Sequence, residues 1–219
     1  MPSYYKLVNG TIEIDGVRMH QTKNKNPWKD SEDKVKELNP TKNSKVLDIC
    51  TGLGYTAIIE ANKGCFVTTI EKDENVLQIM KENPKSKKLF ENQLIKIINA
   101  DTFQEIRKMK GDSFGFIMHD PPRFSFAGEL YSLEFYKQLF RVLKKNGRLF
   151  HYLGNPKGNA LKKGVKRRLE EAGFVKIKWV EDCKGFLASK NYDAHNKEEN
   201  KLKNIISYSN LDIWEDKKK

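Results

Sequence analysis

The amino-acid sequence predicts an α/β fold in which helices cover both faces of a mostly parallel sheet. From Lys45 onward, apolar stretches of strand length alternate with segments of helical periodicity, as in a chain of β/α units. A glycine turn joins the first of these strands directly to a helix. Two final apolar stretches, near 174–181 and 184–189, have no helix between them, so we expect them to pair antiparallel.

A small β-hairpin is expected ahead of this sheet. Tyr4–Val8 and Thr11–Ile14 are two alternating stretches separated by Asn9-Gly10. Asn-Gly at such a place is a strong hairpin signal, because both residues tolerate the positive φ angles of a tight turn. A second turn at Asp15-Gly16 leads into Val17–Met19.

A short helix is expected to follow the hairpin. It runs from Ser31 to Leu38 with Asp30 or Ser31 as N-cap, since short polar side chains accept hydrogen bonds from a first helical turn. Asn39-Pro40 is expected to end it, because a residue before proline avoids the helical conformation. Residues 20–30 are polar, and we expect them to be irregular.

Five β/α units and the final antiparallel pair make a seven-stranded sheet. The five parallel strands are expected at 45–50, 66–71, 94–98, 114–119 and 147–153. Their helices are expected at 55–63, 74–82, 102–109, 132–144 and 161–172. We therefore divide the chain into an appendage (1–40), a main domain (41–190) and a Lys- and Asn-rich tail (191–219).

Composition points to a reduced, soluble protein of the cytoplasm. The 219 residues include three scattered cysteines that lack metal-ligand spacing, so we expect neither a disulfide framework nor a metal site. The sequence contains no apolar run of about 20 residues that would span a bilayer. The net charge of +12 favours a polyanionic partner through counterion release, but a lysine-rich genome or a hot habitat explains it equally well.

The segment Lys45–Thr56 combines a strand, a glycine turn and a helix start, the geometry that binds nucleotide-like ligands. Gly52 and Gly54 allow positive φ angles and close approach of the backbone to a ligand. Glycine spacing alone leaves a dinucleotide site open, since Ala57 is tolerated at the third position of that fingerprint. Asp48 argues against it, because a carboxylate repels a pyrophosphate but pairs with an ammonium group.

This segment resembles motif I of the class I S-adenosylmethionine-dependent methyltransferases, whose Rossmann-like sheet also ends in an antiparallel strand pair. Two further acids support the resemblance. Glu71 follows the second strand, 23 residues after Asp48, where a carboxylate accepts hydrogen bonds from both ribose hydroxyls. Asp101 follows the third strand, where the family's acid contacts the adenine amino group, although a helix N-cap is an equally good role for it.

The resemblance implies that the cofactor is S-adenosyl-L-methionine. It also implies a set of cofactor-binding residues, namely Asp48, Thr51, Gly52, Gly54, Tyr55, Glu71, Lys72, Asp101, Thr102 and Asp120.

Asp120-Pro121-Pro122-Arg123 follows the fourth strand and is similar to motif IV of the amino-methylating members, D/N-P-P-Y/F. The prolines make the loop rigid and remove two donors, so an incoming amino group meets acceptors. The resemblance makes these four residues the catalytic set. Arg123 departs from the motif, with the aromatic residue displaced to Phe124.

D-P-P-R also resembles the motif of RNA 5-methyluridine methyltransferases, whose cysteine attacks the pyrimidine ring. In this chain Gly154 stands where that cysteine is expected, which disfavours covalent pyrimidine chemistry.

Substrate contacts are expected from residues around motif IV. The segment Ser125–Ser132 is aromatic and acidic and is placed to close over a substrate, but packing against the next helix is an equally good reading. The basic run Lys162–Arg168 is either a solvated helix face or a contact for an RNA backbone. The candidate substrate residues are Phe124, Glu129, Tyr131, His151, Asn155 and His20; for His151, a hydrogen-bonded core position is the simpler role.

The combined pattern predicts an S-adenosylmethionine-dependent methyltransferase, similar to an uncharacterised archaeal branch of the class, acting on a nitrogen of a base in tRNA or rRNA. The alternatives are a small-molecule transferase of the same fold, including a spermidine-synthase-like aminopropyl transferase, and a protein methyltransferase. A silent binding module that keeps the cofactor as ligand is a third class.

Overall fold

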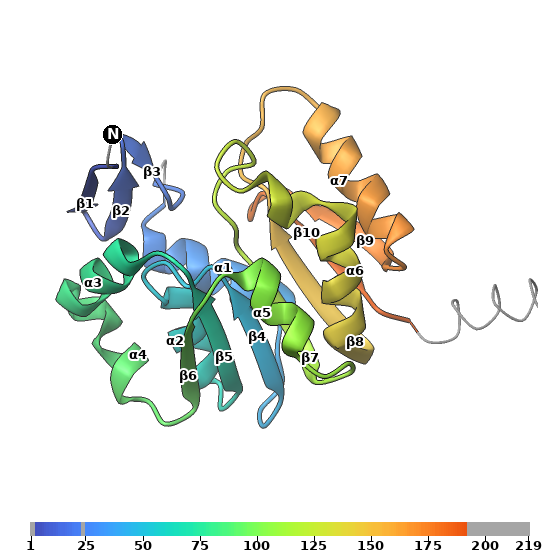
Figure 1. Ribbon diagram of the computed structural model, residues 1–219, viewed down its shortest axis with the longest axis horizontal. Helices are drawn as coiled ribbons and strands as arrows, with labels where there is room; N and C mark the ends of the chain where they lie inside the picture. Colours follow the sequence, from blue (N-terminus) through green and yellow to red (C-terminus); the bar gives the residue numbers. More distant parts are fainter. Residues whose placement is uncertain (1–2, 23–24, 192–219) are drawn as a thin grey trace, which may run out of the picture.

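A seven-stranded sheet forms the centre of the computed structural model, which describes residues 3–22 and 25–191 (Figure 1). The strand order is β6-β5-β4-β7-β8-β10-β9. Its strands are β4 (Lys45–Ile49), β5 (Phe66–Glu71), β6 (Ile95–Asn99), β7 (Phe114–His119), β8 (Leu143–Tyr152), β9 (Val175–Val180) and β10 (Gly185–Ser189). The first five are parallel, and β10 is antiparallel to both β8 and β9. The predicted fold class is confirmed.

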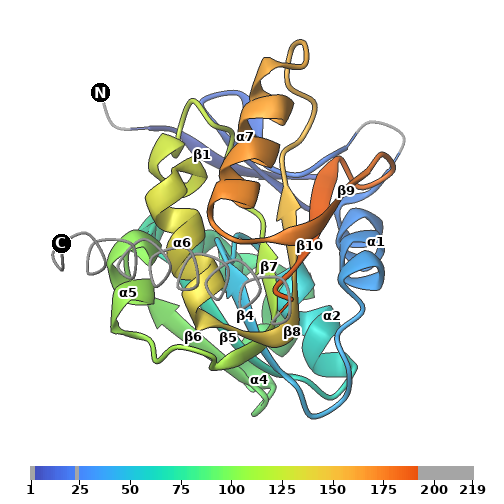
Figure 2. The same ribbon diagram turned by 90° about the vertical axis from the view of Figure 1, so that its right-hand side faces the viewer.

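Helices cover both faces of this sheet. They are α1 (Pro27–Leu38), α2 (Tyr55–Asn62), α3 (Glu74–Glu82), α4 (Lys87–Glu91), α5 (Thr102–Lys108), α6 (Leu133–Val142) and α7 (Ala160–Glu171), with 3-10 turns η1 (Pro84–Ser86) and η2 (Gly128–Tyr131). The helices α5, α6 and α7 lie on one face, and α1 and α2 lie on the other (Figure 2). Each face therefore has its own apolar core.

The N-terminal residues form a three-stranded antiparallel sheet, as the turn signals predicted. It consists of β1 (Tyr5–Val8), β2 (Thr11–Ile14) and β3 (Val17–Arg18). Ile12 is buried in a cluster with Leu53, Tyr55 and Val76, so the small sheet packs over the glycine turn and α3.

The predicted start of the first helix is wrong by one turn. The helix begins at Pro27, and its N-cap is Asn26, whose Oδ1 accepts a hydrogen bond from the backbone N–H of Lys29 at 2.8 Å. Asn followed by Pro at the first helical position is a favourable start. Asp30 and Ser31, the predicted caps, are buried within the helix.

The largest other difference from the predicted boundaries lies between the helix expected over 132–144 and the strand expected over 147–153, and the remaining bounds differ by one residue or none. The helix expected over 132–144 ends at Val142, and β8 begins at Leu143, because apolar residues at this junction suit either element. The short helix α4 was not predicted.

Helix α1 packs on α2 and β8, while the proposed division of the chain at residue 40 stays a prediction. The predicted tail lies outside the described residues from 192 onward. Within the described ranges, no helix is both long and apolar enough to cross a membrane.

Candidate functional site

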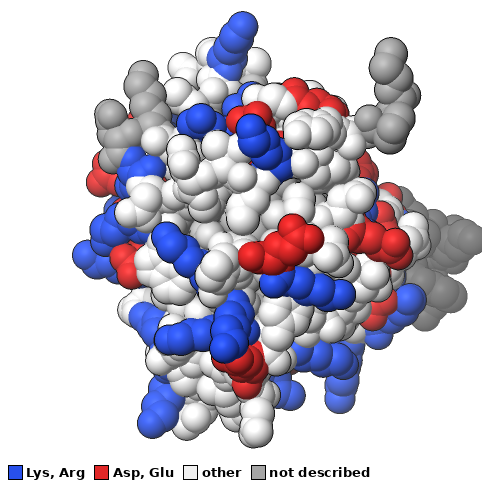
Figure 3. Space-filling view, turned by 90° about the vertical axis from the view of Figure 1, so that its left-hand side faces the viewer, with Lys and Arg blue, Asp and Glu red and all other residues white. Residues whose placement is uncertain are grey.

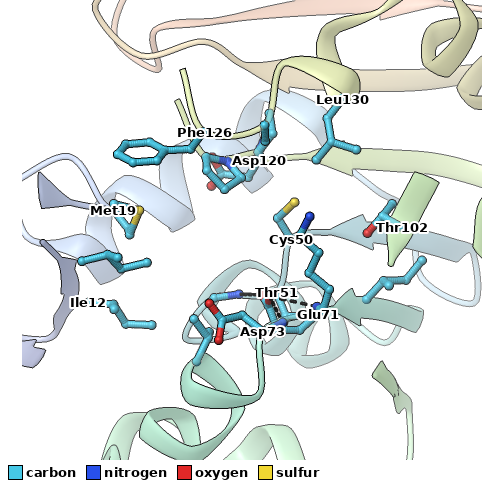
Figure 4. A pocket seen from close by; sticks show the side chains of 18 of the residues that line it. Ile12, Met19, Cys50, Thr51, Glu71, Asp73, Thr102, Asp120, Phe126 and Leu130 are labelled. Atoms are coloured by element: carbon cyan, nitrogen blue, oxygen red, sulfur yellow. Dashed lines mark hydrogen bonds between the residues drawn. The ribbon is translucent and has the colours of Figure 1, made fainter. Parts of the chain in front are cut away.

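A cavity of about 310 Å³ lies at the carboxyl ends of the parallel strands, under the N-terminal sheet. Figure 4 shows side chains from three regions converging on it: Ile12 and Met19 from the N-terminal part, Thr51 from the glycine turn, and Asp120 and Phe126 from the segment after β7. Carboxyl strand ends are where open α/β sheets bind ligands.

The glycine turn has the conformation that its residues require. Cys50, Gly52 and Gly54 have φ angles of 66°, 55° and 72°. A Cβ atom on Gly54 would lie 2.7 Å from the side chain of Leu89, so this position needs glycine for space as well as for conformation. Gly52 lines the cavity, whereas Gly54 caps α2 and does not.

Asp48 lies beneath the turn and does not line the cavity. Its two carboxylate oxygens accept hydrogen bonds from the hydroxyls of Thr56 and Thr69, both at 2.6 Å. Burial raises the pKa of Asp48 to about 6, and the two hydroxyl donors act against this shift. The structure therefore places Asp48 as a support that joins β4 to α2 and β5.

Glu71 lines the cavity with a carboxylate held by backbone donors. Oε1 accepts hydrogen bonds from the N–H groups of Lys72 and Asp73, and Oε2 accepts one from Gly52, each at 3.0 Å. Burial raises the pKa of Glu71, while these three donors lower it. An oxygen of a carboxylate has two acceptor sites, so Oε2 retains one for a ligand.

Lys72 lies between two acids at the rim of the cavity. Its Nζ is 3.5 Å from Asp101 Oδ2 and 3.7 Å from Glu129 Oε1. All three side chains are about half exposed, so these pairs contribute little to stability and are easily exchanged for a ligand. Asp101 also accepts a hydrogen bond from the N–H of Gln104 as the N-cap of α5.

Asp120 forms an ion pair with the buried Lys34. Asp120 Oδ2 lies 2.8 Å from Lys34 Nζ, and the same Nζ lies 2.9 Å from Asp30 Oδ2. Sequence reasoning missed Lys34. A signal existed, because Asp30 and Lys34 share a helical face with Val35 and Leu38, which are core residues.

The rest of the motif IV loop divides between the cavity and the surface. Pro121 and Pro122 line the cavity. The hydroxyl of Tyr131 donates a hydrogen bond to the Pro122 carbonyl at 2.8 Å, which fixes the loop from behind. Arg123 and Phe124 are exposed and do not line the cavity, while Phe126 does line it.

The two candidate histidines occupy different places. His20 lines the cavity and contacts the Thr11 hydroxyl through Nδ1 at 2.9 Å; burial lowers its pKa to about 4. His151 is fully buried outside the cavity, stacked on His119 and in contact with the Tyr136 hydroxyl at 2.9 Å. Burial lowers the pKa of His151 to about 3, so the structure gives it the role of a hydrogen-bonded core residue.

The predicted site residues therefore separate into two groups. Those that line the cavity are Thr51, Gly52, Tyr55, Glu71, Lys72, Asp101, Thr102, Asp120, Pro121, Pro122, Glu129 and His20. Those that do not are Asp48, Gly54, Arg123, Phe124, Tyr131, His151 and Asn155. Among the described residues, no group of three or more His, Cys, Asp or Glu side chains is placed to hold a metal ion.

Sequence comparison finds two relationships. Residues 29–163 match the family described as conserved hypothetical protein 95. An uncharacterised protein of Methanocaldococcus jannaschii is 52% identical over 197 residues, which are 87% of this chain and 68% of that protein.

Structure comparison finds the same fold in several transferases. The spermidine synthase of Thermotoga maritima aligns with a TM-score of 0.63 and 20% identity. The alignment covers 83% of this chain and 65% of that enzyme. A SAM-dependent methyltransferase from Aquifex aeolicus has a TM-score of 0.54 and 22% identity over 74% of this chain and 89% of that one. TrmN from Thermus thermophilus has a TM-score of 0.57 and 23% identity over 73% of this chain and 48% of that one. At such identities the likeness establishes the fold.

Proposed function

The chain belongs to the family described as conserved hypothetical protein 95 and has the fold of SAM-dependent methyltransferases, and from this we propose that it transfers a methyl group to a nitrogen atom. One observation carries the proposal. Asp120-Pro121-Pro122 borders the same cavity as Glu71 and Asp101, so the acceptor loop and the candidate cofactor groups face one space.

S-adenosyl-L-methionine fits the residues of this cavity. Its walls carry six carboxylates but a single ammonium, that of Lys72, among the described lining residues; the acids are Asp15, Glu71, Asp73, Asp101, Asp120 and Glu129. Such walls favour a ligand with a sulfonium and an ammonium group over a pyrophosphate. Glu71 would hold the ribose hydroxyls, and Asp101 with Thr102 would face the base. When bound, the cofactor supplies an electrophilic methyl group.

The chain's own contribution is to place the acceptor nitrogen. Pro121 and Pro122 have no backbone N–H, so an amino group would be held there as a donor, with its lone pair left for the methyl carbon. Transfer would form the N–C bond and break the S–C bond of the bound cofactor, and the nitrogen would then release a proton to solvent. Chemistry of this type depends on alignment, and His20, with its lowered pKa, is not needed as a base.

We propose a base of tRNA or rRNA as the acceptor. The net charge is +12, and α7 carries the run Lys162–Arg168 beside the acceptor loop, where Arg168 Nε donates a hydrogen bond to the Tyr131 carbonyl at 2.8 Å. On the face shown in Figure 3, Lys and Arg side chains are interspersed with acids, so an RNA contact on that face would be a set of local patches. TrmN from Thermus thermophilus has the same fold.

An aminopropyl transferase is the second candidate. It is favoured by the acid-lined cavity, which suits a cationic amine. The extent of the structural match does not separate the two candidates, because spermidine synthase aligns over 83% of this chain and MnmC2 from Aquifex aeolicus over 86%. A protein methyltransferase would use the same chemistry at the acceptor nitrogen. We also propose that the protein is cytoplasmic.

Labelled cofactor tests these proposals. We expect methyl incorporation from S-adenosylmethionine into undermodified RNA, with loss of at least 100-fold in Asp120→Ala because the acceptor loses its charged partner. Asp182→Ala, which changes an exposed acid, is the matched control. Label found only in protein would redirect the assignment to a protein substrate, and turnover of decarboxylated cofactor with an amine would establish the second candidate.

A further inference from the structure

A buried ion cluster joins α1 to the end of β7, next to the proposed acceptor loop. The side chain of Lys34 is 1% exposed and that of Asp30 is fully buried. Lys34 Nζ contacts Asp30 at 2.9 Å and Asp120 at 2.8 Å, and it lies 3.8 Å from the ring centroid of Tyr152. Burial would lower the pKa of Lys34, but the carboxylates of Asp120 and Asp30 raise it above its ordinary value, so the ammonium stays charged.

This contact makes the two oxygens of Asp120 unequal. Oδ2 is held by Lys34, whereas Oδ1 accepts no hydrogen bond from any residue of the described chain. The side chain of Asp120 is 21% exposed and borders the cavity. One oxygen of this carboxylate is therefore committed to the protein interior, and the other is left for a ligand.

We propose that Lys34 is a positioning residue that fixes the orientation of the Asp120 carboxylate through Oδ2, which leaves Oδ1 as the acceptor for an N–H of the methylated group. The proposal rests on the function proposed above. A carboxylate without this charged partner would rotate more freely. It would then present a misplaced acceptor to the incoming amine.

The alternative is a purely structural role. In that case Lys34 serves only to neutralise the buried Asp30, whose charge would otherwise be unpaired. The variants Lys34→Met and Asp30→Asn/Lys34→Met separate the two roles. The double variant keeps the same net charge in the cluster as wild type, one negative, but it lacks the cation beside Asp120.

Three measurements are made on wild type, both variants and Lys36→Met, an exposed lysine of the same helix that serves as control. They are the melting temperature, the separate kcat and KM values for methyl transfer, and the side-chain rotamer populations of Asp120 from NMR scalar couplings. Lys34→Met is expected to melt earlier, and the double variant is expected to recover most of that loss.

The double variant distinguishes positioning of Asp120 from neutralisation of Asp30. We expect its kcat/KM to stay at least tenfold below wild type, mainly through kcat, and we expect Asp120 to populate several rotamers where wild type populates one. A double variant with the wild-type rate and the wild-type rotamer populations would overturn the proposal. The NMR measurement requires no substrate, so it still tests Lys34 if wild type transfers no methyl group, which would instead refute the proposed function.

Discussion

The carboxylate of Asp48 shows how a single buried residue supports the glycine turn. Thr56 is in α2 and Thr69 is in β5, so hydrogen bonds from their hydroxyls to Asp48 tie the turn to two neighbouring elements. The group is fully buried, and its pKa of about 6 lies above its ordinary value of 3.8. In the folded state its charge therefore changes near pH 6.

Replacing Asp48 by Asn should remove a pH dependence of stability. Between pH 3.8 and about 6 the folded state binds a proton that the unfolded state has released, so the free energy of unfolding falls as pH rises. The full effect of this group is about 3 kcal/mol. We expect urea unfolding from pH 4 to 7 to show that the free energy of unfolding of Asp48→Asn increases relative to that of wild type as pH rises.

Asp182→Asn is the control for this measurement, because Asp182 is exposed. It should follow the wild-type curve at every pH. A constant difference between Asp48→Asn and wild type would contradict the assignment of the pH dependence to Asp48.

At the scale of elements, helix α1 is the one whose start matters for the site. Its first turn is fixed by Asn26 and Pro27, and the resulting register turns Lys34 inward beside Val35 and Leu38. A start at Ser31, as the sequence predicted, would have left Asp30 as an exposed cap. The additional turn instead buries Asp30 against Lys34, and this makes the ion cluster possible.

Asn26→Ala should destabilise the protein by about 1 kcal/mol, because it removes the side-chain acceptor for the backbone N–H of Lys29. Chemical denaturation measures the loss. Asn159→Ala is a matched control: Asn159 precedes α7 without a side-chain capping hydrogen bond, so its replacement should have a much smaller effect. Equal losses in the two variants would show that the capping hydrogen bond of Asn26 does not contribute to the free energy of unfolding.

At the scale of the whole molecule, the N-terminal sheet forms one wall of the cavity. The Tyr5 hydroxyl donates a hydrogen bond to Asp73 Oδ2 at 2.5 Å, and the Tyr55 hydroxyl donates one to the Gly10 carbonyl at 3.0 Å. The bond to Asp73 is the main reason that the pKa of Tyr5 rises to about 12. These contacts attach the small sheet to the glycine turn and α3, so they fix the position of this wall relative to the strand ends that border the cavity.

Tyr5→Phe should loosen this wall. We expect faster hydrogen exchange in β1 and β2, and a cofactor affinity reduced about three- to tenfold, or about 0.7–1.4 kcal/mol. This is part of the about 1.5–3 kcal/mol that a hydrogen bond to a charged group contributes, because the bond lies beside the ligand and not on it. Tyr4→Phe is the control, because Tyr4 is 69% exposed and should leave both quantities unchanged. Exchange rates equal to wild type in Tyr5→Phe would show that apolar packing of Ile12 alone holds the sheet.

Sequence patterns predicted much of the fold because the relevant signals are local. Strand and helix periodicity, the Asn9-Gly10 turn and the glycine turn at Gly52 each depend on a few neighbouring residues. The prediction failed where two local signals competed, as at Leu143, or where the signal lay outside the expected element, as at Asn26-Pro27.

For the site, the sequence by itself determined which acids follow which strands, since parallel strand ends meet at one edge of the sheet. It did not determine which side chains turn into the cavity, as Asp48 and His151 show by lying outside it. Lys34 is the clearest case of what only the tertiary structure decided. It lies 86 residues from Asp120 along the chain, and the two charges meet because α1 packs across the sheet, a contact between distant segments that is encoded by no local pattern.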